Sequence, residues 1–257
     1  MVSNNITGFY EQIYSDDLVL DRPYRRGDTG QKVVLIQEWL CLHGIHIVID
    51  GCFDPATERA IRIFQNRKEI YEDGVVENVT FAELIKPVTN ALSFRARDDD
   101  SLGSIVVECA KAHLKQRPRE IGGDNRGPWI RLYLDSWQEV PWCAGFVSFI
   151  LRQSTFSIDD IPPLKTSFSC DLLAKNAKLK NLLLEQPDKG DRLKIKPGSL
   201  FLKRVSDSRW NHTGIVSKTE NEFFYSIEGN SNDTGDNEGY EVCERIRNYA
   251  NKDFILI

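Results

Sequence analysis

The sequence feature that most limits the fold is a short motif that occurs twice, at residues 50–57 and again at residues 73–80. The two segments read DGCFDPAT and DGVVENVT, so each has the form Asp-Gly-x-apolar-x-x-x-Thr. An Asp-Gly pair favours a tight turn, and each threonine is predicted to begin a helix. A turn and a helix that recur in register predict a small helical domain with one shared core.

Three amphipathic helices are predicted in this region. The first covers about residues 31–42, where apolar residues recur at helical spacing. Asp54 followed by Pro55 predicts the start of the second helix, because proline is tolerated at the first helical position. Thr80 and Glu83 form a Thr-x-x-Glu capping box that predicts the start of the third helix. Together the helices predict a compact domain of about 65 residues.

This region resembles the peptidoglycan-binding domain found on many cell-wall hydrolases. The residues that carry the resemblance are Gly30, Val33, Leu35, Gln37, Leu40, Gly44, Asp50, Gly51, Phe53, Thr57, Ala60, Phe64, Gln65, Asp73, Gly74, Val76, Thr80 and Leu84. The resemblance implies a wall-binding domain at residues 22–88, after an N-terminal extension at residues 1–21. Most of these positions are core and turn positions, so they indicate the fold more strongly than the ligand.

A second domain is predicted after a linker at residues 89–101, which contains polar residues and a run of three aspartates. From Leu102 onward apolar residues recur at helical spacing, and a second apolar helix is predicted from Trp142 to Leu151. The later segments SLFLKRV, HTGIVSK and EFFYSIE read as short strands. This order predicts an α+β domain at residues 102–257.

Cys143 is the candidate nucleophile of the second domain. It follows Pro141 and precedes the apolar run AGFVSFIL, so it is predicted to lie at a helix N-terminus, where the helix dipole favours a thiolate. The same spacing places Cys143 on an apolar helical face, and a cysteine in that position is often only a core residue. The sequence around Cys143 leaves both interpretations open.

His212 is the candidate base among the four histidines of the chain. His43 and His46 lie in the first domain. His113 has Cys109 one helical turn before it and could form a dyad with it, but that pair lies in the middle of a helix, away from its N-terminus. His212 begins a strand-like segment after polar residues, where a side chain can face a cleft.

Glu228 and Asn230 are the candidate groups that orient the imidazole. They lie two residues apart on the next predicted strand, and extended backbone would place both side chains on one face. Either group could fix the histidine tautomer, and the carboxylate would also stabilise an imidazolium ion. The alternative is a surface turn, because Gly229 and Asn230 both favour turns.

Taken in order, PWCAGFVSF, NHTGIV and IEGN resemble the CHAP family of NlpC-related, cysteine- and histidine-dependent amidases and peptidases. The resemblance implies a papain-like α+β fold with a central antiparallel sheet, and an acyl-transfer reaction that uses Cys143, His212, Glu228 and Asn230. It also implies that backbone N–H groups at the helix start bind the oxyanion.

Three further residues are predicted to bind substrate. Trp142 and Trp210 flank the candidate nucleophile and base and could line the cleft, with buried packing as the alternative for each. Asn125 lies in the segment GGDNRGPWIRLYL, which also resembles the CHAP family.

No metal or cofactor is predicted. The set Cys41, His43, His46 and Cys52 contains zinc-ligand types, but its spacing is not a recurrent ligand pattern. Some CHAP proteins bind calcium ahead of the nucleophile, whereas here only Asp124 and Asp135 are available there. Six cysteines at irregular spacing predict mostly free thiols.

Composition limits the partners of the chain. The 33 basic and 38 acidic residues give a formal charge of -5, without a basic run that could follow a nucleic-acid backbone. The first twenty residues lack the pattern of a Sec-type signal peptide, and no segment has the apolar length of a membrane span. We therefore expect synthesis in the cytoplasm and no nucleic-acid partner or stable membrane insertion.

The two resemblances together predict a bacteriolytic peptidoglycan hydrolase, either an N-acetylmuramoyl-L-alanine amidase or a stem-peptide or cross-bridge endopeptidase. It would reach the wall or periplasm as a phage endolysin or through dedicated secretion as an effector toxin, in which case an immunity protein or export partner is expected. The alternatives are a non-enzymatic wall-binding protein with a degenerate papain-like domain and a cysteine peptidase that acts on proteins.

Overall fold

The computed structural model describes residues 15–97, 99–136, 138–233 and 238–257, so most of the predicted N-terminal extension lies outside the described residues. The described chain divides into two compact units. The first comprises the residues up to Asn90 together with Glu120–Ser136, and the second comprises Ala91–Arg119 and the residues after Ser136. The segment Glu120–Ser136, which the sequence analysis assigned to the second domain, therefore packs in the first unit.

The first unit is helical. Its elements are η1 (Ser15–Asp17), α2 (Gln31–Leu42), α3 (Pro55–Arg67), α4 (Asn78–Leu84), the part of α5 (Lys86–Leu92) up to Asn90, and α7 (Pro128–Leu134). The bounds of α2 agree with the sequence prediction, and α3 begins at Pro55 with Asp54 as N-cap, whose carboxylate accepts from Thr57 N at 2.8 Å. Helix α5 continues into the segment predicted as a linker.

A buried glutamine explains the first copy of the repeated motif. Gln37 on α2 accepts a hydrogen bond from Gly51 N at 2.8 Å and donates to Asp50 Oδ1 at 3.0 Å and to Thr57 Oγ1 at 3.2 Å. Gly51 has a φ of 74°, in the left-handed region that glycine enters without strain. One side chain thus holds both the turn and the helix that follows it.

Gln65 repeats this arrangement in the second copy. It accepts from Gly74 N at 2.8 Å and donates to Asp73 Oδ1 at 2.8 Å and to Thr80 Oγ1 at 3.1 Å. The capping box predicted for Thr80 and Glu83 is wrong, because α4 already begins at Asn78 and Thr80 lies inside the helix. The motif threonines serve as hydrogen-bond acceptors for the glutamines and do not begin helices.

Helix α7 is joined to the first unit by a buried ion network. Arg131 donates to both carboxylate oxygens of Glu38, at 3.1 and 2.6 Å, and to Asp17 Oδ2 at 2.5 Å. The ring of Trp129 packs edge-on against Trp39 of α2, with their centroids 6.2 Å apart. These contacts explain why Glu120–Ser136 belongs to the first unit.

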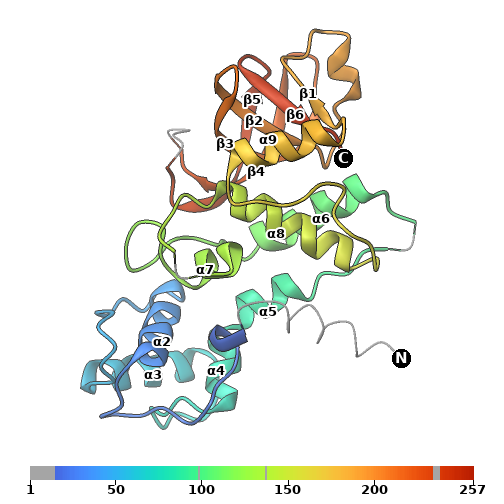
Figure 1. Cartoon of the computed structure of the whole chain (residues 1–257). Helices are drawn as coiled ribbons and strands as arrows, with labels where there is room; N and C mark the ends of the chain where they lie inside the picture. Colours follow the sequence, from blue (N-terminus) through green and yellow to red (C-terminus); the bar gives the residue numbers. More distant parts are fainter. Residues whose placement is uncertain (1–14, 98, 137, 234–237) are drawn as a thin grey trace. The chain divides into compact units, whose positions relative to one another are not determined.

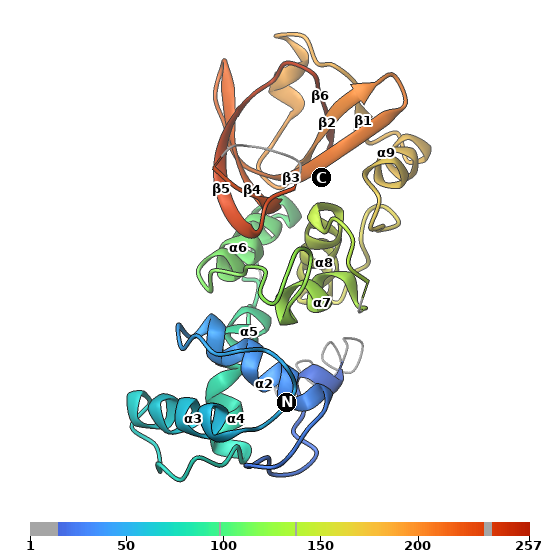
Figure 2. The same ribbon diagram turned by 90° about the vertical axis from the view of Figure 1, so that its left-hand side faces the viewer.

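The second unit combines helices with one antiparallel sheet (Figures 1 and 2). Its helices are α6 (Leu102–Leu114), α8 (Cys143–Phe156), α9 (Cys170–Leu179) and η2 (Asp191–Lys194). Its strands are β1 (Leu183–Leu184), β2 (Leu200–Ser206), β3 (Arg209–Thr219), β4 (Phe223–Ser231), β5 (Glu241–Asn248) and β6 (Lys252–Ile255). The prediction of a mixed fold with a central antiparallel sheet is confirmed for the described residues.

The strand order of the sheet is β1-β6-β2-β3-β4-β5, which places β3 and β4 side by side. Helix α8 packs against both of these strands, and α9 packs against β3. The predicted strand segments lie in β2, β3 and β4 and carry the apolar residues Phe201, Val216 and Phe224 into a shared core cluster. The candidate nucleophile on α8 is thereby brought next to the strands that carry the candidate base and its partner.

Candidate active site

Cys143 is the first residue of α8, and Trp142 is its N-cap. The thiol therefore lies where the first N–H groups of the helix have no intrahelical acceptor and where the helix dipole favours negative charge. Phe146 and Val147 on the next turn are fully buried and fix this end of the helix in the core. Cys143 itself keeps 3% of its surface exposed.

His212 on β3 forms a hydrogen bond with Glu228 on the neighbouring strand β4. The distance from His212 Nε2 to Glu228 Oε2 is 2.8 Å, and both side chains are buried. The other ring nitrogen, Nδ1, has no hydrogen-bond partner among the described residues. Cys143 and His212 each shift the pKa of the other, and because Nε2 is bound to Glu228, Nδ1 is the ring nitrogen left for the thiol.

Glu228 is held by three further residues. Ser226 donates to Oε1 at 2.5 Å and Ser231 to Oε2 at 3.3 Å. Arg247 on β5 donates to both oxygens, at 2.9 and 2.6 Å. Burial raises the pKa of Glu228, but the bonds from Arg247 and His212 outweigh it and hold that pKa well below its usual range. The carboxylate is therefore ionised and fixed in orientation.

Gly214 leaves the space through which Glu228 reaches the imidazole. It lies two residues after His212 on β3, and a Cβ atom at this position would come within 2.7 Å of Glu228 Cγ and 2.8 Å of a Phe201 ring carbon. A side chain at residue 214 would thus displace the carboxylate that holds His212.

The charges of the site favour a thiolate and an imidazolium ion. The hydrogen bond with Cys170 lowers the pKa of Cys143 most, burial opposes this effect, and His212 lowers the pKa further, to well below its usual range. Burial lowers the pKa of His212, but Cys143 and Glu228 together raise it to about 9. Each group stabilises the charged form of the other, as an activated cysteine nucleophile requires.

Asn230 lies two residues after Glu228 on β4, on irregular backbone. Its φ is 55°, and the pairing of β4 with β5 is shifted between Glu228 and Ser231. The regular extended strand assumed in the sequence analysis is therefore interrupted at Asn230. The hydrogen bond to the imidazole comes from Glu228, and a role for Asn230 in orienting the ring stays a prediction.

Trp142 is fully buried, which agrees with its packing alternative and not with substrate contact. A Cβ atom at Gly229 would lie 2.7 Å from the Trp142 ring and 2.6 Å from Phe146 Cβ. Only glycine fits between this ring and the β4 backbone, so Trp142 packs α8 tightly against the strand that carries Glu228.

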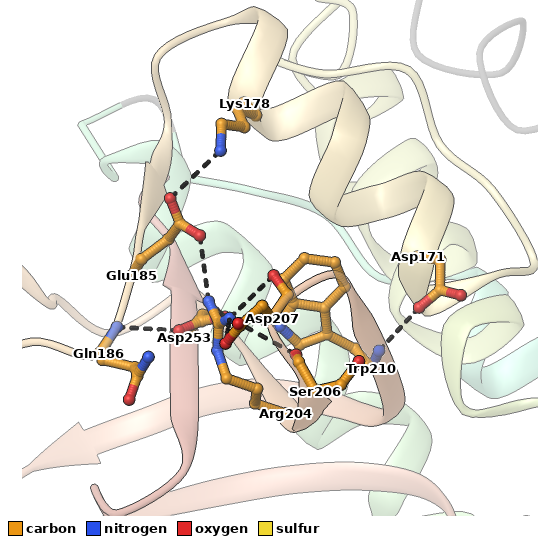
Figure 3. A network of polar contacts seen from close by, with 9 residues as sticks. All are labelled: Asp171, Lys178, Glu185, Gln186, Arg204, Ser206, Asp207, Trp210 and Asp253. Atoms are coloured by element: carbon orange, nitrogen blue, oxygen red, sulfur yellow. Dashed lines mark hydrogen bonds and ion pairs between the residues drawn. The ribbon is translucent and has the colours of Figure 1, made fainter.

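Trp210 belongs to the polar network drawn in Figure 3. Its indole N–H donates to Asp253 Oδ2 at 2.6 Å, and the Arg204 guanidinium, 5.3 Å from the ring centroid, also bonds Asp253 at 2.6 Å. Its backbone N donates to Asp171 Oδ1 at 2.7 Å. These contacts give Trp210 a structural role, since they join the start of β3 to the start of α9.

Asn125, the third predicted substrate-binding residue, belongs to the first unit. It is half-buried and has a φ of 55° in the turn before α7. Its predicted contact with substrate stays a prediction.

The alternative dyad of Cys109 and His113 is buried in the core. His113 Nε2 lies 2.8 Å from Gln153 Oε1, and burial lowers the pKa of His113 to about 4. Burial raises the pKa of Cys109 to about 12. Both groups are therefore neutral near pH 7, which is unsuitable for a thiolate–imidazolium pair.

Within the candidate zinc-ligand set, His43 is engaged in other contacts. His43 Nε2 lies 2.8 Å from the carbonyl of Leu84, and its ring packs on Phe64. Across the described ranges, no three His, Cys, Asp or Glu side chains are arranged to hold a metal ion.

Two residues of the candidate site, Arg247 and Cys170, were not predicted from the sequence. Arg247 lies on β5, a strand that was not predicted, because VCERIRN places two apolar residues side by side and lacks a regular apolar–polar alternation. Cys170 begins α9 after the N-cap Ser169, and SCDLLAKNAKL has the pattern of a capped amphipathic helix. Its sulfur lies 3.9 Å from that of Cys143.

Comparison with known proteins confirms the N-terminal prediction. A family model described as "Putative peptidoglycan binding domain" matches residues 29–84, which include both copies of the motif. The N-terminal domain of SleB is 29% identical in sequence, with a TM-score of 0.26, over 26% of this chain and 93% of that domain.

A Burkholderia AP3 phage endolysin is 24% identical, with a TM-score of 0.24, over 36% of this chain and 36% of the endolysin. No curated protein matches the chain. In the part of the chain that the structure describes, no helix combines the length and the apolar character needed to cross a membrane.

Proposed function

We propose that the protein is a cysteine-dependent peptidoglycan hydrolase that cleaves an amide bond of the bacterial cell wall. The observation that carries this proposal is a thiol at a helix N-terminus, beside an imidazole whose far nitrogen is held by an ionised carboxylate. The family match at residues 29–84 supports peptidoglycan as the polymer to which the first unit binds. We further propose a CHAP-like, papain-like character for the second unit.

In the proposed reaction, the Cys143 thiolate attacks the carbonyl carbon of the amide. The imidazolium of His212 then donates its proton to the leaving amine, and the product is a thioester on Cys143. Neutral His212 then removes a proton from water, and the water attacks the thioester. Release of the acid product restores the Cys143 thiolate and the His212 imidazolium. Glu228 keeps the imidazole in place and stabilises its charged form throughout.

The N-terminus of α8 supports this chemistry in a second way. The backbone N–H groups of its first turn, that of Cys143 included, have no acceptor within the helix. A carbonyl oxygen that becomes negatively charged during attack can accept from them. The buried surroundings strengthen these bonds, because little water competes for the donors.

The proposal is tested by digestion of purified sacculi with the full chain and with Cys143→Ala, followed by mass spectrometry of the released fragments. We expect soluble muropeptides from the wild type and none above background from the variant. The new ends of the fragments would identify the cleaved amide. The exposed Cys52 provides a control, since Cys52→Ala should digest sacculi like the wild type.

Equal digestion by Cys143→Ala would contradict the nucleophile assignment. Binding to sacculi without any release of fragments by the wild type would instead favour a non-enzymatic wall-binding protein.

A further inference from the structure

Two thiols from different helices meet in the second unit. The sulfur atoms of Cys143 and Cys170 lie 3.9 Å apart, and neither residue is in a disulfide. Each cysteine is the first residue of its helix, α8 for Cys143 and α9 for Cys170. The two residues keep 3% and 7% of their surface exposed, so they form a shielded pair.

The position of Cys170 is fixed by the residues on either side of it. Ser169 caps α9 by accepting from Leu172 N at 3.4 Å. Asp171 accepts from the backbone N of Trp210 at 2.7 Å, two residues before His212 on β3 (Figure 3). The start of α9 is thereby tied to the strand that carries the candidate base. The backbone that carries Cys170 is therefore held next to β3 by the residues on either side of it.

The two thiols differ in protonation. Cys143 has a lowered pKa because of its hydrogen bond with Cys170 and its interaction with His212. The pKa of Cys170 is raised, first by the neighbouring Cys143 and then by burial. The pair therefore holds one thiolate and one protonated thiol, which is the arrangement of a reactive cysteine next to a resolving cysteine.

We propose that Cys143 and Cys170 form a site of reversible oxidation, at which a hydroperoxide converts the two thiols into a disulfide. The Cys143 thiolate attacks one peroxide oxygen, the O–O bond breaks, and the other oxygen leaves and takes up a proton as water or an alcohol. Cys143 becomes a sulfenic acid and has lost two electrons to the peroxide.

In the second step Cys170 loses its proton and attacks the sulfenic sulfur of Cys143. The S–S bond forms as the S–O bond breaks, and hydroxide leaves with that proton as water. The sulfurs must approach by about 1.9 Å to reach the usual bond length of about 2.05 Å. Rotation of the two cysteine side chains provides that movement. In total, two thiols and one hydroperoxide give one disulfide, one alcohol or water, and one further water.

The disulfide would switch off the proposed hydrolase, because its sulfur cannot attack an amide. This consequence rests on the proposed function, whereas the oxidation itself does not. Cys170 would also protect Cys143, since an unresolved sulfenic acid can be oxidised further to forms that thiols do not reduce.

The test exposes the reduced full chain to hydrogen peroxide, blocks the remaining thiols with N-ethylmaleimide and maps the tryptic peptides by mass spectrometry. We expect wild type to lose the mass of two hydrogen atoms and to yield a linked peptide that contains Cys143 and Cys170. Dithiothreitol should restore both thiols and the release of muropeptides. Cys52→Ser should give the same linkage, because that exposed thiol lies in the other unit.

Cys170→Ser should instead accumulate sulfinic acid at Cys143, and dithiothreitol should not restore the hydrolysis that the untreated variant shows. The inference is overturned if wild type forms no linkage between these two cysteines, or if wild type and Cys170→Ser recover equally under reduction. If Cys143→Ala hydrolyses sacculi like the wild type, the proposed function fails, while the peptide map still decides whether the disulfide forms.

Discussion

At the scale of the residue, the candidate site depends on how firmly one carboxylate is held. Glu228 accepts bonds from residues on β3, β4 and β5, so its position is determined by three strands at once. Its charge offsets the burial of the imidazole, which would otherwise favour neutral His212. The protonation of His212 is therefore the property most sensitive to substitution here.

The first prediction concerns pH. Because the pKa of His212 is raised to about 9, its imidazolium is present below that pH and is lost as the pH rises through it. The leaving amine needs that proton, so kcat/KM for a soluble muropeptide should fall on the alkaline side near pH 9. Glu228→Gln removes a charge that raises this pKa and should move the alkaline limb to lower pH. Glu222→Gln, at an exposed carboxylate, should leave the limb in place. An unmoved limb in Glu228→Gln would contradict the assigned pair.

The second prediction concerns Arg247, which we regard as a positioning residue. Arg247→Met removes two bonds to Glu228, and one bond to a charged group is worth about 1.5–3 kcal/mol. Where the energy of one such bond contributes to stabilising the transition state, its loss lowers kcat roughly ten- to hundredfold. Arg247→Lys keeps the charge but not the two-pronged geometry and should recover only part of kcat. A change in KM alone, with kcat unchanged, would show that Arg247 does not act through the imidazole.

At the scale of the element, local patterns predicted some structures and could not predict others. Helix α2 and the three central strands follow from apolar periodicity, which is a property of short segments. Helix α7 could not be placed in the first unit from its own residues, since the acidic partners of Arg131, Glu38 and Asp17, lie 93 and 114 residues earlier in the chain. Likewise Cys143 and His212 could be paired by elimination, but Cys170 has no local feature that reveals its neighbour.

The third prediction tests the ion network that holds α7. Arg131→Met leaves Glu38 buried without its partner, and breaking a buried ion pair in this way costs about 3–5 kcal/mol. A urea titration followed by tryptophan fluorescence should show an earlier transition for the first unit, which contains Trp39 and Trp129. Arg26→Met breaks an exposed ion pair to Glu58 in the same unit and should change stability by less than about 1 kcal/mol. Equal midpoints for Arg131→Met and wild type would contradict a stabilising role of the network.

At the scale of the whole molecule, the chain passes between its two units more than once. The first unit takes residues on both sides of Ala91–Arg119, so neither unit is a continuous piece of sequence. A cut near residue 90, which the sequence alone suggests, removes the partners of α7 and leaves α7 attached to the second unit. The ring of Trp129, 1% exposed in the full chain, would then lose its contact with Trp39 of α2.

The last prediction follows from this chain path. A fragment of residues 91–257 should be poorly soluble, because the apolar face of α7 no longer has a core to join. A second fragment, in which a Gly-Ser segment of equal length replaces residues 120–136, should stay soluble and still hydrolyse soluble muropeptides. Since it lacks the residues that match the peptidoglycan-binding family, it should no longer sediment with purified sacculi. Sedimentation with sacculi as strong as that of the full chain would show that the second unit alone binds the wall. Equal solubility of the two fragments would show that α7 does not need the first unit.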